Sequence, residues 1–157
     1  MSKYEDAMKL MDERCGGGKD NLLALATVSL APKADGTPRP AVRMLDGYYE
    51  DGVFFISTNA AKSKMKEIAV NNEVGIAGVD WFTAQGTAES LGWVKDEKNA
   101  EILAKMKKCF EWFSDHGDEN NPDSIVLKVT LTSAVITDNE KKYGEWQYRV
   151  DFINKTA

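Results

Sequence analysis

Residues 41–71 read AVRMLDGYYEDGVFFISTNAAKSKMKEIAVN, and this stretch contains three predicted elements in a fixed order. A strand carrying Arg43 comes first, and Asp51-Gly52 predicts a tight turn after it. A second strand is expected over Val53–Ser57. A helix then covers Ala61–Asn71, because apolar residues recur there at helical spacing. We therefore expect two antiparallel strands followed by a helix at the centre of the fold.

Charges along the predicted helix run in an unfavourable order. Lys62, Lys64 and Lys66 precede its first acidic residue, Glu67. Each cation at a helix N-terminus costs about 0.3–1 kcal/mol if nothing compensates it. A bound phosphate would compensate, using free backbone N–H groups, the Ser63 hydroxyl and the lysines together. A solvated lysine face is the alternative, because exposed charges are screened.

Arg43 lies inside the apolar run Pro-Ala-Val-Arg-Met-Leu. A charged side chain in a buried strand needs a partner. One interpretation is an internal salt bridge, for example to Asp46 or Asp80. The other is an external anion, because a guanidinium group matches a phosphate or a ring rich in carbonyl groups.

The remaining sequence predicts mainly strands. Helices are expected over Ser2–Cys15, Ala61–Asn71 (core face Met65, Ile68 and Ala69) and Lys95–Trp112 (Ala100, Leu103, Ala104 and Met106 inside). Strands are expected over Leu22–Leu30, Pro40–Leu45, Val53–Ser57, Val74–Val79, Phe82–Ser90 and Ile125–Ile136. Gly47 is a turn signal. The tail, Tyr143–Ile153, is either a last strand or an arm that contacts a partner. Strands and helices do not alternate, so we expect one mainly β (α+β) domain over residues 1–157, an antiparallel barrel with three flanking helices.

Composition excludes several functional classes. The 157 residues are 43% hydrophobic and carry a net charge of −5, which argues against unspecific binding to nucleic acid or anionic lipid. No apolar run approaches the roughly 20 residues of a membrane span, and the N-terminus is too polar for a signal peptide. Cys15 and Cys109 suggest reduced thiols in the cytoplasm. With His116 as the single histidine, we expect no metal site and no Ser-His-Asp site.

Several short motifs resemble those of the pyridoxamine-phosphate oxidase-like, FMN-binding split-barrel family. They lie within Leu22–Ser90 and are Arg43-Met44-Leu45, Phe55-Ile56-Ser57-Thr58-Asn59, Lys62-Ser63-Lys64 and Asn71-Asn72-Glu73-Val74. The resemblance implies an antiparallel split β-barrel with FMN as the cofactor. It also implies a homodimer with the flavin at the interface.

The resemblance also implies a role for particular residues. Arg43, Met44 and Leu45 would lie along the flavin ring and ribityl chain. Ser57 and Thr58 would contact the ribityl-phosphate region. Lys64 matches the phosphate lysine, and Lys62-Ser63 replaces the Ser-Arg pair of the family. Gln85 and Trp146 are candidates for contacts from the second subunit.

The predicted function is that of an FMN-dependent oxidoreductase acting on an unidentified small substrate. The substrate-phosphate set of the true oxidase is missing from the tail, where Arg149 stands alone, so the resemblance is to the general-stress-protein-like branch. No catalytic residue is assigned. A non-enzymatic FMN-binding or stress-response protein is the alternative, and a site holding haem, a deazaflavin or nothing is another.

Overall fold

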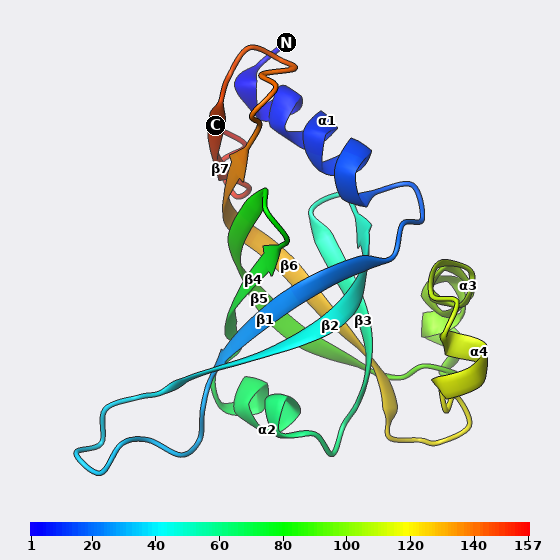
Figure 1. Cartoon of the computed structure of the whole chain (residues 1–157). Coiled ribbons are helices and arrows are strands. Elements are labelled where there is room, and N and C mark those ends of the chain that lie inside the picture. The colour runs from blue at the N-terminus through cyan, green and yellow to red at the C-terminus, as the bar shows by residue number, and fades with distance from the viewer.

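The computed structural model describes residues 1–157 and has a closed, antiparallel β-barrel at its centre (Figure 1). The strands are β1 (Asn21–Val28), β2 (Pro40–Glu50), β3 (Val53–Asn59), β4 (Glu73–Gly78), β5 (Phe82–Trp93), β6 (Ser124–Thr137) and β7 (Gln147–Asp151). Their order is β3-β2-β1-β4-β5-β6-β7, and pairing of β3 with β6 closes a ring of six. The predicted antiparallel barrel is confirmed, and the tail supplies its extra strand.

The long strand β6 is shared between two neighbours on one edge. Its first half pairs with β3, from Ser124 to Thr130, and its second half pairs with β7, from Ser133 to Thr137. On the other edge β5 follows β6 for most of its length. The β3–β6 pairing therefore closes the ring of strands along the first half of β6, and β7 extends the sheet along the second half.

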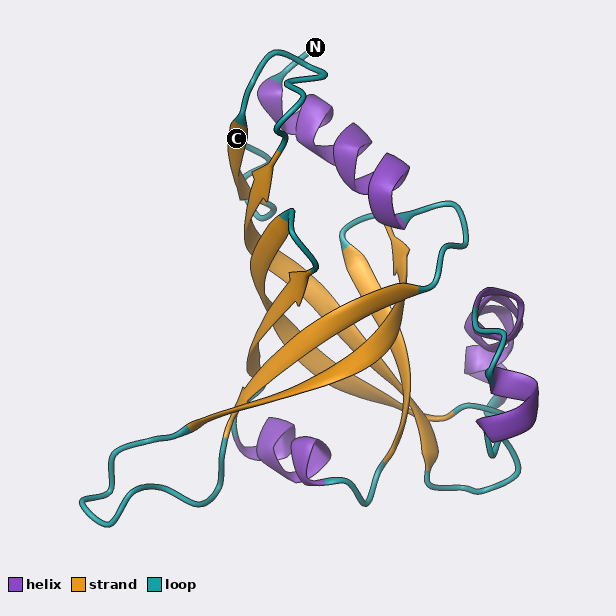
Figure 2. Cartoon of the chain, viewed as in Figure 1, coloured by secondary structure: helices purple, strands orange, loops and turns teal.

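Four helices surround the barrel (Figures 1 and 2). They are α1 (Lys3–Cys15), α2 (Ser63–Val70), α3 (Ala100–Cys109) and α4 (Phe113–His116). α1 lies across one end of the barrel beside β7, α2 covers the opposite end, and α3 and α4 lie beside β3. None of these helices is both long enough and apolar enough to cross a membrane.

A buried ion pair fastens α1 to the far end of the chain. The helix begins with the predicted capping box of Ser2 and Glu5. At its other end, the Arg14 guanidinium donates to the Thr137 carbonyl at 2.7 Å and to the Asp138 carboxylate at 2.8 Å. It also lies over the Trp81 ring, 5.2 Å from the centroid. Asp138 is fully buried, so Arg14 supplies its counter-charge.

Alternation along β1 and β2 decides which side chains enter the barrel. Leu23, Leu25 and Thr27 point inward and are buried. Arg43 pairs with Leu25 across the two strands, which places it on the same inward face. Met44 points outward and is 55% exposed. The register therefore brings a charged side chain into the barrel, near the end covered by α2.

Gly47 is not a turn residue, as the sequence predicted, but lies inside β2. A Cβ atom at this position would come within 2.5 Å of the Leu23 side chain, so the glycine makes room for the core. The predicted turn at Asp51-Gly52 is confirmed, and both residues have positive φ. The strand consequently continues five residues beyond its predicted end at Leu45.

The predicted helix over Lys95–Trp112 is interrupted. A short 3₁₀ turn, Glu97–Asn99, precedes α3, and α4 is separate. The buried Asn99 amide donates to the carbonyls of Leu91 and Trp93 at 2.9 and 2.8 Å, which fixes the chain where the helix begins. Met106 is buried as predicted, but Ala100 and Ala104 are exposed and Leu103 is half-buried.

A second, smaller core explains why the chain bends there. It contains Val94, Met106, Cys109, Phe110, Phe113 and Val126. Phe110 and Phe113 reach it from the two ends of the break between α3 and α4. Both cysteines, Cys15 and Cys109, are free and buried, so they act as small apolar side chains.

Asp20 predicts a pH dependence of folding stability. Its side chain is exposed, but partial desolvation, the charge of Asp46 and a hydrogen bond with it, and then the charge of Glu111 raise its pKa to about 6. A carboxyl group whose pKa is raised in the folded state stabilises that state when protonated, so its contribution is lost as pH rises from about 4 to 6. We therefore expect Asp20→Asn to raise the urea midpoint at about pH 7.5 and to leave it nearly unchanged at about pH 3.5, below the unfolded pKa.

The matched control is Asp115→Asn, at an exposed carboxylate on α4. This change should leave the midpoint unaltered at both pH values. Equal effects of Asp20→Asn at about pH 3.5 and about pH 7.5 would contradict the assignment of the titration to Asp20.

Candidate functional site

The start of α2 has unsatisfied hydrogen-bond donors. Lys62 is the N-cap residue, and its side chain makes no capping hydrogen bond. The first turn holds no acidic residue, and the backbone N–H groups of Ser63 and Lys64 have no acceptor within the chain. Free N–H groups and the positive end of the helix dipole together favour an anion.

Arg43 is held inside the protein by three groups. One guanidinium nitrogen donates to the Thr27 hydroxyl at 2.7 Å and to the Leu25 carbonyl at 3.3 Å. The other donates to the Glu67 carboxylate at 2.9 Å. Thr27 and Glu67 are 3% and 5% exposed. The internal partner of Arg43 is therefore Glu67, not Asp46 or Asp80.

This buried network joins three elements of the fold. Thr27 belongs to β1, Arg43 to β2 and Glu67 to α2, and the Thr27 hydroxyl also lies 3.2 Å from the Glu67 carboxylate. A buried ion pair of this kind is costly to break, because the remaining charge would lose its partner. The network therefore fixes α2, and with it the start of the helix, against the barrel.

Lys64 is a half-buried cation without an acidic partner. It forms no ion pair with any carboxylate of the chain. Burial, and then the charges of Arg43 and Lys62, lower its pKa. The Arg43 charge is balanced by Glu67, so Lys62 and Lys64 provide the unbalanced positive charge at this end of the barrel. With the Ser63 hydroxyl and the free N–H groups, they form a donor set suited to a phosphate.

The other residues predicted on this side lie along the two adjoining strands. Ser57 and Thr58 are half-buried near the end of β3, where this strand pairs with β6. They come shortly before α2 in the chain. Leu45 packs inward against the core, whereas Met44 points to the opposite face of β2. Arg43, Met44 and Leu45 therefore present their side chains to two different faces.

Gln85 and Trp146 lie outside the donor set of Lys62, Ser63 and Lys64, which we call the lysine cluster. Trp146 directly precedes β7, at the end of the barrel opposite α2 (Figure 1). Its ring is 52% exposed, and its Nε1 donates to Asn139 at 3.3 Å. Gln85 is exposed on the outer face of β5. Their predicted role as contacts from a second subunit stays a prediction.

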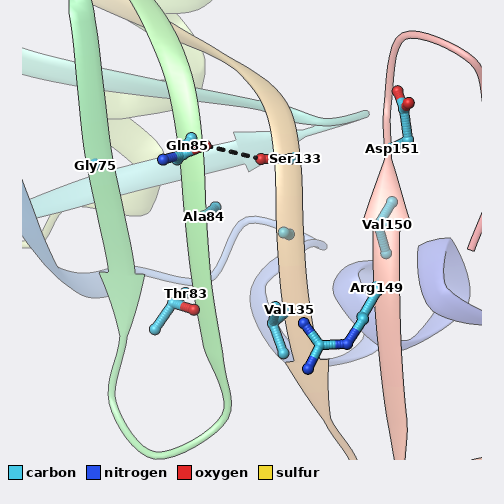
Figure 3. Close-up of a pocket in the computed structure, with 10 residues that line it drawn as sticks. Gly75, Thr83, Ala84, Gln85, Ser133, Val135, Arg149, Val150 and Asp151 are labelled. Carbon is cyan, nitrogen blue, oxygen red and sulfur yellow. Dashed lines mark hydrogen bonds between the residues drawn. The ribbon is translucent and has the colours of Figure 1, made fainter.

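An open groove of about 570 Å³ crosses the outer face of the sheet from β4 to β7 (Figure 3). Its lining is Gly75, Thr83, Ala84, Gln85, Ser133, Ala134, Val135, Arg149, Val150 and Asp151. The Ser133 hydroxyl donates to the Gln85 side-chain carbonyl at 3.3 Å. This groove shares no residue with the lysine cluster, and apart from Gln85 and the isolated Arg149 its residues gave no sequence signal.

Sequence reasoning missed Glu67, which lies in the buried network beside the lysine cluster. The predicted core face of the helix was Met65, Ile68 and Ala69, but Ala69 is exposed and Glu67 is buried in its place. A partial signal was available, because Arg43 required a buried acid and Glu67 is the one acidic residue of this helix. Asp46 and Asp80 met the same requirement, so this signal did not select Glu67.

Comparison with known proteins gives a family. A family model described as pyridoxamine 5′-phosphate oxidase matches residues 18–138. No curated protein matches the chain. Among solved structures, a Clostridium acetobutylicum protein related to general stress protein 26 of B. subtilis (pyridoxinephosphate oxidase family) is 18% identical, with a TM-score of 0.61 over 97% of this chain and 96% of that chain.

Two other structures share the fold. The haem storage protein HutZ from Vibrio cholerae is 18% identical, with a TM-score of 0.59 over 83% of this chain and 91% of its own. An F420 reductase is 18% identical, with a TM-score of 0.54 over 78% of this chain and 94% of its own. At this identity the likeness concerns the fold.

Proposed function

Because the chain belongs to the pyridoxamine 5′-phosphate oxidase family, we propose that it binds FMN and acts as an oxidoreductase on a small organic substrate. One observation carries the proposal. Lys64 is a half-buried cation without an acidic partner, and it lies at a helix start with two free N–H groups. This arrangement favours an anion, and the terminal phosphate of FMN would supply one.

Each part of the cofactor has candidate residues in this chain. Lys62, Ser63 and Lys64 would hold the phosphate, and Ser57 and Thr58 would contact the ribityl chain beside it. The backbone of Met44 and Leu45 would lie along the ring, because their side chains point to opposite faces of β2. When bound, FMN supplies hydride or electron transfer, and the protein contributes binding and orientation.

Arg43 would act on the phosphate site indirectly. Its guanidinium is engaged by Thr27 and Glu67, so it fixes the position of α2. The direct contact with the flavin that the resemblance implies for Arg43 stays a prediction. Lys64 then remains as the principal cation for the phosphate.

The outer face of β1 and β2 supports a homodimer. Leu22, Val42 and Met44 are 53%, 70% and 55% exposed on neighbouring positions of these strands. Exposed apolar patches of this kind favour a protein partner. A second copy of the chain would cover the patch, and its Gln85 and Trp146 would approach the flavin. We propose a cytoplasmic location for this dimer.

Flavin binding without catalysis is the second candidate. His116, the single histidine, is exposed on α4, so the lysine cluster has no histidine to act as an acid or base. A protein that stores or senses flavin needs none. Turnover of reduced nicotinamide with an added acceptor would favour the oxidoreductase, and stable flavin binding without turnover would favour the second candidate.

We expect Lys64→Gln to weaken FMN binding by about tenfold or more, because a hydrogen bond to a charged group contributes roughly 1.5–3 kcal/mol. The dissociation constant is measured by quenching of flavin fluorescence. Lys66→Gln is the matched control, because Lys66 is an exposed lysine on the same helix.

Three results would contradict the proposed cofactor. The first is an equal effect of the Lys64 and Lys66 substitutions. The second is an absorbance spectrum with a haem band. The third is no flavin uptake by protein whose circular dichroism shows an intact fold.

A further inference from the structure

The groove between β4 and β7 contains a cation without an acidic partner. Arg149 is exposed on the outer face of β7 and forms no ion pair within the chain. In Figure 3 its guanidinium group extends toward Val135, away from Asp151. Arg149 is therefore free to bind an anion in the groove.

Asp151 does not neutralise Arg149, although it follows two residues later on the same face. Its carboxylate accepts hydrogen bonds from the backbone N–H groups of Ile153 and Asn154, both at 2.9 Å, and from the Asn154 side chain at 2.7 Å. These hydrogen bonds lower the pKa of Asp151, so the carboxylate stays ionised, but it is held by Ile153 and Asn154 and forms no ion pair with Arg149.

Gln85 adds one free donor to the groove. The Gln85 side-chain carbonyl accepts from Ser133 at 3.3 Å, and its backbone carbonyl accepts from the Thr132 hydroxyl at 3.2 Å. The Gln85 amide NH₂ makes no hydrogen bond within the chain and stays available. A ligand with acceptor oxygens would thus meet the Arg149 guanidinium and the Gln85 amide.

The floor of the groove suits a flat ligand. Gly75 has no side chain, and the neighbouring outward positions on β5 and β6 carry the short side chains of Thr83, Ser133 and Val135. A volume of about 570 Å³ falls within the usual range of small-molecule sites. A planar apolar body would therefore fit against this surface.

We propose that the groove binds a planar organic carboxylate, with the carboxylate on Arg149 and an acceptor oxygen near Gln85. The guanidinium fork matches a carboxylate in two parallel hydrogen bonds. A single arginine with Asp151 nearby favours one negative charge over the two of a phosphate monoester. That this ligand is the substrate rests on the FMN function proposed above. Binding of the ligand in the groove does not depend on that function.

Benzoate is the probe, and its dissociation constant is measured by NMR titration of the full chain, with and without FMN. We expect Arg149→Gln to weaken benzoate binding by about tenfold and to leave the FMN dissociation constant unchanged. Benzamide, which is neutral and similar in shape, should bind more weakly than benzoate. Lys141→Gln is the control, because Lys141 is an exposed cation outside the groove.

The outcomes separate this inference from the proposed function. Benzoate binding that survives Arg149→Gln, or inorganic phosphate that competes better than benzoate, would overturn the groove assignment. Benzoate binding that depends on Arg149 in a protein that takes up no FMN would keep the groove and overturn the flavin function. Circular dichroism of each variant shows whether the fold is intact, and Arg149→Lys tests whether the forked geometry is needed in addition to charge.

Discussion

Replacing Arg43 with methionine is expected to lower the free energy of unfolding by about 3–5 kcal/mol, because the change leaves the Glu67 carboxylate buried without its counter-charge. Glu67 is 5% exposed, and Thr27 would be its one remaining side-chain partner. Methionine approximately preserves the volume, so a lost charge rather than a cavity should dominate. Urea unfolding followed by tryptophan fluorescence measures the change.

The double variant Arg43→Met, Glu67→Met identifies the cause. A buried ion pair can often be exchanged for apolar side chains of similar size at little cost, so most of the stability should return. Arg39→Met is the control, since Arg39 is exposed just before β2 and forms no ion pair. A double variant as unstable as Arg43→Met would show that the ion pair is not the source of the effect.

Arg14→Met is expected to lower the free energy of unfolding by about 3 kcal/mol, because Asp138 is fully buried and would lose its cation. The estimate is at the low end of the range, since the Lys142 N–H still donates to Asp138 at 2.7 Å and Arg14 itself is partly exposed. The Thr137 carbonyl and the Trp81 ring would also lose a contact. Thermal unfolding measures the global effect.

Hydrogen exchange locates the loss. The backbone amides of α1 should lose protection, because Arg14 forms the most buried of the ion pairs between this helix and the chain after β6. The other two pairs, Lys3–Glu145 and Glu13–Lys142, are more exposed. Lys9→Met, at an exposed position on the same helix, should leave the exchange unchanged. Loss of protection throughout the barrel with none specific to α1 would mean that Arg14 does not anchor the helix.

The barrel could be predicted because its strands are short apolar runs separated by turn residues. Asp51-Gly52 indicated a hairpin of two strands, and the structure has it as β2 and β3. Gly47 shows where this reasoning fails. A glycine can mark a turn or make space in a strand, and the choice here depends on Leu23, which lies on the neighbouring strand.

The partner of Arg43 could not be predicted because it comes from a short helix. With eight residues, α2 can bury Met65 and Ile68 while including either Ala69 or Glu67 on the packed side. Packing against β1 decides between them, and Thr27 supplies a hydroxyl for the acid. The need for a buried acid follows from local sequence, but its identity follows from tertiary contacts.

The groove was beyond sequence reasoning for a similar reason. Gln85 and Ser133 become neighbours through the β5–β6 register, and Val135 and Arg149 through the β6–β7 register. These residues are far apart in the chain, and each is unremarkable alone. A single arginine in the tail gave no indication that the amide of β5 would lie on the same face.

The β3–β6 pairing that closes the ring has a consequence for the rate of folding. The β1–β2, β2–β3 and β4–β5 pairs join neighbouring segments, whereas β3 meets β6 only after β4, β5 and both helices of the smaller core have been synthesised and brought back. Closing such a long loop costs entropy before its contacts form, so we expect folding over roughly milliseconds to seconds. If β3 and β6 pair after the transition state, substitutions at the β3–β6 contact will mainly accelerate unfolding. The lifetime of the native barrel will then depend on this one strand pairing.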